Sequence, residues 1–192
     1  MYAEHALIIS GSDKGLDGVA GFLKASGCRS VATLFSGSEA RRQIAYSDYE
    51  LIIINTPLQD EFGYDLACKL SAATCSGIIL ICRADLAAEM ADRTVDAGVS
   101  VITKPLNKTA FAQAIRMGIG FNRRLSALYQ ENNKLRNKLE ETRVINRAKF
   151  LLITEEQMTE EEAHKTIEKT AMDTRRTKGD VARDIVAKYA QC

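Results

Sequence analysis

The side chains that could carry out nucleophilic, redox or metal chemistry are few in this sequence and lie far apart. Its five cysteines stand in irregular contexts, and the evenly spaced Cys68, Cys75 and Cys82 form neither a metal-binding nor a disulfide pattern. His5 and His164 are the only histidines that could join them. Because no nucleophile–base pair or metal constellation is recognisable, an enzyme is the least favoured class. We expect reduced core thiols, no bound metal and no cofactor.

Polar residues also follow short apolar runs, and these runs are the strands that must position them. Ala6–Ile9 is followed by Ser10 and Gly11, and Leu51–Ile54 is followed by Asn55. Continuous apolar runs of this kind are typical of strands buried on both faces. Further strands are expected at Gly77–Cys82, Val99–Thr103 and, from a weaker pattern, Ser30–Phe35.

Amphipathic helices are expected between these strands, at Leu16–Ala25, Gly37–Ala45, Gly63–Leu70 and Leu86–Ala97. This alternation predicts an α/β fold with a doubly wound, parallel, five-stranded sheet. Ligands of such sheets bind beyond the carboxyl ends of the strands. The residues at those ends therefore decide what chemistry the domain can perform.

Residues 5–120 resemble the receiver domain of bacterial response regulators, which has a flavodoxin-like fold. The resemblance rests on the position of the Leu51–Ile54 strand and on Gly63, eight residues after Asn55. It also rests on the Lys104-Pro105 pair that follows the last strand. The resemblance implies an acidic pair after the first strand that holds magnesium, an aspartate after the third that accepts phosphate, and a hydroxyl residue after the fourth that binds it.

The chain departs from that pattern at every position but one. The corresponding residues are Ser10 and Gly11 for the acidic pair, Asn55 for the aspartate, Cys82 for the hydroxyl residue and Lys104 for the family's lysine. An amide is not the carboxylate nucleophile that forms an acyl phosphate, and Mg²⁺ prefers charged oxygen ligands. We therefore expect residues 1–120 to form a degenerate receiver, or pseudo-receiver, that is not phosphorylated.

Lys104 is expected to be a structural remnant of the phosphate site. Its ammonium would donate hydrogen bonds to Asn55 or to strand-end carbonyls, and the alternative is that it captures some other anion. Asp13 is near enough in sequence to replace a metal ligand, but one carboxylate on a turn makes a poor metal site.

A long helical pattern extends from Phe111 to Leu152 and carries one narrow stripe. Its members alternate four- and three-residue steps, as in a coiled-coil seam: Phe121, Leu125, Leu128, Asn132, Leu135, Leu139 and Thr142. Asn132 occupies an a position of the heptad, where a buried Asn fixes register and two-stranded pairing. We predict a parallel homodimer through a linker helix at residues 121–142. The alternative is a long helix that folds back on its own chain.

Charged residues beside the seam favour parallel pairing of two helices in one heptad and oppose it in the next. Glu131, at heptad position g, would face Arg136, at position e of the second copy. Lys138 and Arg143 form the following pair and repel each other. With about three heptads, the seam is close to the shortest that identifies a coiled coil.

The residues after the seam carry signals for short helices. Thr159 and Glu162 form a capping box with an acidic first turn, and Thr177 can cap a last helix. The inner face of the first is expected to hold Ala163, Ile167, Thr170, Ala171 and Thr174, and that of the last Val181, Ala182, Ile185, Val186 and Tyr189. Together with the end of the long helix they predict a small three-helix bundle.

This region is similar to the ANTAR domain, the RNA-binding module named after the antitermination regulators AmiR and NasR. The similarity covers about residues 125–190 and rests on Ile145-x-Arg147-Ala148-Lys149, Met158-Thr159-Glu160-Glu161-Glu162-Ala163, Ala171-Met172 and Val181-Ala182-x-x-Ile185. Phe150 stands where the family often has Gly. The resemblance implies that residues 143–192 bind paired hairpins in nascent leader RNA.

Five basic residues are the candidates for RNA contact because phosphates attract Arg and Lys. They are Arg147, Lys149, Arg175, Arg176 and Lys178. Tyr189 could offer a stacking face for a base. For Arg175 and Arg176, simple capping of a helix C-terminus is an equally good explanation.

Charge separates the two halves of the chain, although the net charge is only +1. Residues 1–107 hold 9 basic and 13 acidic side chains, giving −4, whereas residues 108–192 hold 17 and 12, giving +5. The basic half is therefore the better place for a polyanion. No apolar run approaches a membrane span, and the N-terminus has no features of a signal peptide, so we expect a cytoplasmic protein.

The leading hypothesis from the sequence is a dimeric RNA-binding transcription antiterminator with a receiver-like domain that is not phosphorylated. An alternative of another class is a protein–protein signalling module, in which the pseudo-receiver docks a sensor or partner protein and the tail only dimerises. A phosphorylated regulator acting on DNA is disfavoured by Asn55 and by the lack of a helix-turn-helix signature. The sequence identifies neither the target RNA nor the controlling signal.

Overall fold

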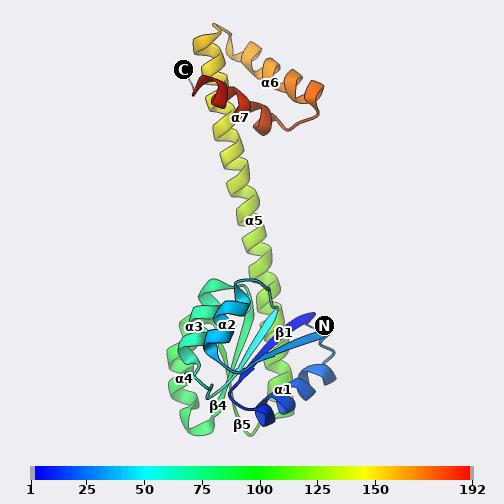
Figure 1. Cartoon of the computed structure of the whole chain (residues 1–192), viewed down its shortest axis with the longest axis vertical. Coiled ribbons are helices and arrows are strands. Elements are labelled where there is room, and N and C mark those ends of the chain that lie inside the picture. Colours follow the sequence, from blue (N-terminus) through cyan, green and yellow to red (C-terminus); the bar gives the residue numbers. More distant parts are fainter. Residues whose placement is uncertain (1–2, 191–192) are drawn as a thin grey trace. The chain divides into compact units, whose positions relative to one another are not determined.

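The chain folds into two compact units, Met1–Leu128 and Tyr129–Cys192, and the computed structural model describes residues 3–190 (Figure 1). We call them the N-terminal unit and the C-terminal unit. The helix α5 (Lys108–Glu155) contributes residues to both. No helix in the described part of the chain is both long and apolar enough to cross a bilayer.

The N-terminal unit is built on one parallel sheet, as predicted. Its strands are β1 (His5–Ser10), β2 (Ser30–Leu34), β3 (Leu51–Asn55), β4 (Gly77–Arg83) and β5 (Ser100–Lys104), in the order β2-β1-β3-β4-β5. Its helices are α1 (Asp13–Ala25), α2 (Gly37–Ile44), α3 (Tyr64–Ala73), α4 (Ala87–Thr94) and the first part of α5. Short 3-10 turns, Ala84–Leu86 and Val95–Ala97, flank α4, so the helix predicted at Leu86–Ala97 is only partly α-helical.

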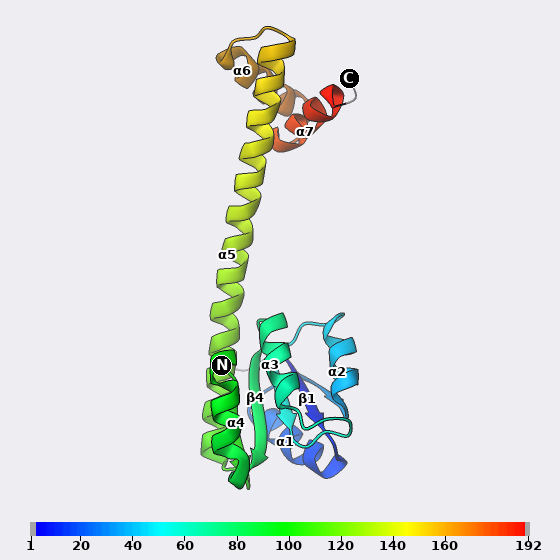
Figure 2. The ribbon, with the colours of Figure 1, turned by 90° about the vertical axis from the view of Figure 1, so that its left-hand side faces the viewer.

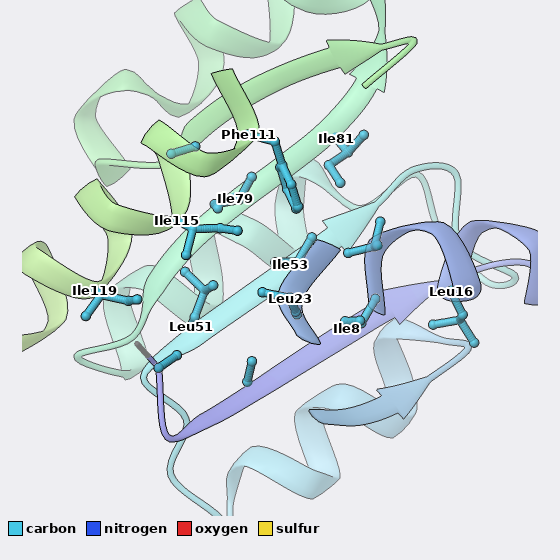
Figure 3. Packing of buried hydrophobic residues seen from close by; sticks show 14 residues of the cluster. Ile8, Leu16, Leu23, Leu51, Ile53, Ile79, Ile81, Phe111, Ile115 and Ile119 are labelled. Carbon is cyan, nitrogen blue, oxygen red and sulfur yellow. The ribbon is translucent and has the colours of Figure 1, made fainter. Parts of the chain in front are cut away.

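Alternate residues of the central strands point to opposite faces of the sheet, and each face has its own core. Ile8, Ile53 and Ile79 pack with residues of α1 and α5 on one face, where Phe111 is fully buried (Figure 3). Side chains from α2, α3 and α4 cover the other face. A sheet covered on both faces explains why β1, β3 and β4 are continuously apolar in sequence.

Two glycines let α5 approach the sheet closely. A Cβ atom on Gly77, at the start of β4, would lie only 2.2 Å from the carbonyl oxygen of Gly118 in α5. A Cβ on Gly118 would lie 2.7 Å from Leu51 Cδ1. Any larger side chain at either glycine would push the helix away from the strand, which accounts for a glycine inside an otherwise uninterrupted helix.

The C-terminal unit consists of the end of α5, α6 (Glu160–Thr174) and α7 (Lys178–Tyr189) (Figure 2). Both predicted caps are present: Thr159 and Glu162 form a capping box, and Thr177 forms another with Asp180. The core holds Ala148, Leu152, Ala163, Ile167, Ala171, Val181 and Ala182.

The prediction that Thr170 and Thr174 lie on the inner face of α6 is wrong. Both are exposed, and their hydroxyls donate to the carbonyls of Thr166 and Thr170, one turn earlier. The buried stripe of α6 is therefore narrower and consists of Ala163, Ile167 and Ala171, which are spaced four residues apart.

Candidate functional site

The carboxyl ends of β1 and β3 bring Ser10 and Asn55 together. The two residues are register partners, and Asn55 Nδ2 donates to Ser10 Oγ at 2.9 Å. Ser10 Oγ in turn donates to the carbonyl of Ser12 at 3.2 Å. Both side chains are buried, so this pair of hydrogen bonds fills the edge of the sheet where ligands of a doubly wound fold bind.

The second polar atom of the Asn55 side chain has no partner. Its Oδ1 is buried and accepts no hydrogen bond from the described residues. The carboxamide of Asn55 is therefore held through its nitrogen, by the hydrogen bond to Ser10.

Lys104 is held by the main chain rather than by Asn55. Its Nζ donates to the carbonyl oxygen of Thr56 at 2.6 Å, so of the two partners predicted for it the structure contains the strand-end carbonyl. Burial lowers the pKa of the Lys104 ammonium. The side chain thus bridges the ends of β5 and β3.

The remaining two positions do not offer metal or phosphate chemistry. A Cβ on Gly11 would lie 2.6 Å from the carbonyl oxygen of Pro57, so no carboxylate fits there unless this loop moves. Cys82 is fully buried, and burial raises the pKa of its thiol although the charge of Lys104 acts in the opposite direction. Residues 3–190 contain no cluster of three His, Cys, Asp or Glu side chains that could hold a metal.

An acidic residue that sequence reasoning missed anchors the loop after β3. The Asp60 carboxylate accepts hydrogen bonds from the N–H groups of Gly37 and Ser38, at 2.8 and 3.0 Å, and from Ser38 Oγ at 2.8 Å. These donors lower the pKa of Asp60 to about 2. The contact connects the loop to the start of α2, and its only trace in the sequence is an aspartate without an assigned role.

Three of the five cations predicted to bind RNA are already paired with carboxylates. Lys149 Nζ lies 2.9 Å from Glu160 Oε1, and Arg176 lies 2.6 Å from Asp184. Lys178 pairs with Glu168. These carboxylates come from α6 and α7 and neutralise the charge of the three cations.

Arg147 and Arg175 differ from the other three. Both are exposed, and no ion pair within residues 3–190 involves either of them. Arg175 is the residue that ends α6, in the left-handed conformation with φ 53°. The two guanidinium groups are thus the predicted contacts that are free to meet a phosphate.

Tyr189 is less available for stacking than its sequence position implies. Its hydroxyl binds the Glu156 carboxylate, and Lys188 Nζ lies 4.9 Å from the centre of its ring. One face of the ring is therefore occupied by a cation of its own chain.

The predicted seam residues are solvent-exposed in the single chain. Leu128, Leu135 and Leu139 each expose more than half of their surface, and Asn132 is exposed as well, whereas Leu125 is half-buried. Nothing in the described part of the chain folds back over this stripe, so an unpartnered apolar face remains.

The sheet order and the coverage of both faces define the fold class of the N-terminal unit. Residues 6–116 match the response regulator receiver domain, and residues 133–186 match the ANTAR domain. The chain therefore belongs to the response regulators with a receiver domain, and it combines that domain with an ANTAR domain.

Relatives and solved structures agree with this assignment. The chain is 29% identical over 165 residues to the transcriptional regulatory protein PdtaR of Mycobacterium tuberculosis, covering 85% of this chain and 80% of that one. A CheY-like receiver domain protein from Methanospirillum hungatei matches with a TM-score of 0.56 and 20% identity over 63% of this chain and 97% of its own. A chain described as adenylate cyclase from Rhodopirellula baltica matches with a TM-score of 0.61 and 19% identity over 68% and 98%. The two structures establish the fold alone.

Proposed function

We propose that this protein is a dimeric RNA-binding regulator of transcription antitermination, whose receiver domain is degenerate and does not accept phosphate. The observation that carries the proposal is the match of residues 133–186 to the ANTAR domain. The proposed ligand is a pair of hairpins in a nascent leader RNA. A regulatory partner protein would act on the N-terminal unit, in the cytoplasm.

The basic side chains of the C-terminal unit support RNA as the ligand. Arg147 lies on α5 and Arg175 ends α6, and both are exposed. Guanidinium groups bind phosphate in a bidentate manner and stack on unpaired bases, as hairpin loops require. Lys149, Arg176 and Lys178 would join them once phosphates displace their carboxylate partners.

The loss of phosphate chemistry is supported by the strand-end geometry. The carboxamide of Asn55 is bound to Ser10, and Lys104 is bound to the main chain at Thr56. With Gly11 against Pro57, the position of a metal-binding carboxylate is closed by backbone. Regulation would then come from a partner protein or from the RNA itself. Either can shift the equilibrium between two conformations of this protein only if it binds one of them more tightly than the other.

The proposed domain boundaries are residues 1–120 for the receiver, 121–142 for the linker helix and 143–192 for the ANTAR domain. The packing of α7 on α5 supports the second boundary. A Cβ on Gly179 would lie 3.0 Å from Glu141 Cγ, so the bundle reaches α5 at this residue.

A gel-shift titration of the full chain against leader RNAs tests the proposal. We expect an RNA with two tandem hairpins to bind far more tightly than one hairpin, because the second contact of a dimer is made at high effective concentration. Placing the two hairpins on separate molecules should remove that advantage. Equal affinity for one hairpin and for two at matched salt would overturn the dimeric part, and no RNA binding at all would favour the protein–protein alternative.

A further inference from the structure

Phe150 is a large apolar residue that no contact in the described chain explains. It lies on α5 within the C-terminal unit, and 63% of its surface is exposed. The bundle core takes its neighbours Ala148 and Leu152, so α6 and α7 cover a different side of α5. An exposed phenylalanine indicates an interaction surface only where it continues an apolar patch, so its position relative to the stripe on α5 decides its meaning.

The face on which Phe150 lies is that of the apolar stripe. It follows Asn132 by 18 residues, which is five turns of an α-helix, so the two side chains leave the helix in the same direction. It follows Leu139 by 11 residues, or three turns. Leu135 and Leu139 are exposed to a similar extent, at 56% and 62%.

Lys149 shows why the stripe must change its period here. A continued heptad would place Lys149 in the seam, at the d position after Thr142. In the structure its side chain is only 18% exposed and its Nζ lies 2.9 Å from Glu160, so it is turned toward α6. An eleven-residue step from Leu139 avoids Lys149 and continues the stripe through Asn146 to Phe150.

We propose that Phe150 extends the self-association face of α5 into the C-terminal unit, where it packs against Phe150 of a second copy of this chain. Parallel pairing in register brings equal residue numbers together, which is the pairing that an Asn at the a position favours. Glu131 and Arg136 are in no ion pair within residues 3–190 and so remain available to the second copy. The inference rests on the dimer of the proposed function but does not depend on RNA.

The test measures self-association of the full chain in the absence of RNA, by analytical ultracentrifugation. Phe150→Ala should weaken the dimer by about tenfold or more, as for a central apolar contact, whereas Phe150→Leu should retain most of it. Met172→Ala is the matched control, because Met172 is an apolar residue on α6 that is 78% exposed, and its replacement should leave association unchanged. Circular dichroism checks that each variant is folded.

A cross-link gives a second, independent readout. Phe150→Cys should form a disulfide between copies on mild oxidation, identified by peptide mapping, while Asn137→Cys, on another side of α5, should not. Unchanged association of Phe150→Ala, or a monomeric wild-type chain, would overturn the proposal. So would loss of RNA affinity in both Phe150→Ala and Phe150→Leu with association unchanged, which would mean that Phe150 stacks on a base. Self-association through Phe150 without RNA binding would refute the proposed function and leave this inference standing.

Discussion

The side-chain amide of Asn55 donates a hydrogen bond to the hydroxyl of Ser10 across the ends of β3 and β1. These are the positions that hold the phosphate-accepting aspartate and one acidic metal ligand in a working receiver. The contact joins two residues that would each need a carboxylate for that chemistry, and it uses the amide as a donor, which a carboxylate cannot be.

Incubation with acetyl phosphate and Mg²⁺ should therefore leave the intact mass of the protein unchanged. The physical reason is that no carboxylate is available at Asn55 or at the metal positions Ser10 and Gly11. Intact mass spectrometry makes the measurement, with a phosphorylatable receiver as the positive control. A species heavier by one phosphoryl group, wherever it mapped, would contradict the degenerate assignment.

Replacement of Asp60 by Ala should destabilise the N-terminal unit by on the order of 1 kcal/mol at pH 7, the usual cost of losing a helix cap. The folded pKa of Asp60 is about 2, below the ordinary 3.8, so its stabilisation is present above pH 3.8 and is lost as the pH falls through about 2. Urea unfolding at several pH values should show the difference between wild type and variant shrinking in that window. Ser38→Ala, which loses only one of the three donors, should cost less.

Replacement of Asn132 by Leu should tighten the dimer by about tenfold or more, because a polar a-position residue trades stability for a single register. Leu128→Asp combined with Leu135→Asp should abolish association. Light scattering at micromolar concentration distinguishes the variants. A wild-type chain that is monomeric, and unaffected by the double substitution, would refute the seam.

Neutralising a carboxylate should strengthen RNA binding where it frees a cation. Glu168→Gln releases Lys178, so we expect several-fold tighter binding in gel-shift titrations. Glu161→Gln is the control, since it releases Lys165, which is outside the predicted contacts. Arg147→Ala should weaken binding and lower the slope of affinity against salt by about one. Identical affinities for Glu168→Gln and the control would argue against Lys178 as a contact.

The strands and caps could be predicted because their causes are local. The apolar composition of runs such as Leu51–Ile54 is enough to predict that they are buried. Thr159 and Glu162 form the hydrogen bonds of their capping box within one helical turn. The start of α5 at Lys108 also has a local cause, because Asn107 Oδ1 accepts hydrogen bonds from the N–H groups of Thr109 and Ala110.

Contacts between elements could not be predicted in the same way. The ion pair of Lys178 with Glu168 joins two helices through the turn between them, and that of Lys149 with Glu160 spans the end of α5. Which carboxylate a basic residue meets depends on how the helices cross, and no single-residue property encodes it. The hydrogen bonds from Gly37 and Ser38 to the Asp60 carboxylate likewise join positions that are 23 and 22 residues apart.

The two capping boxes also bear on how quickly each unit folds. In the C-terminal unit, helix starts are set within a turn and α6 packs on α7, the next helix along the chain, and helical units of this kind fold in about microseconds to milliseconds. The sheet must also pair Ser10 with Asn55, which are 45 residues apart, and parallel pairing of such distant segments is slow. The unit synthesised first is therefore expected to fold more slowly than the helical unit that follows it.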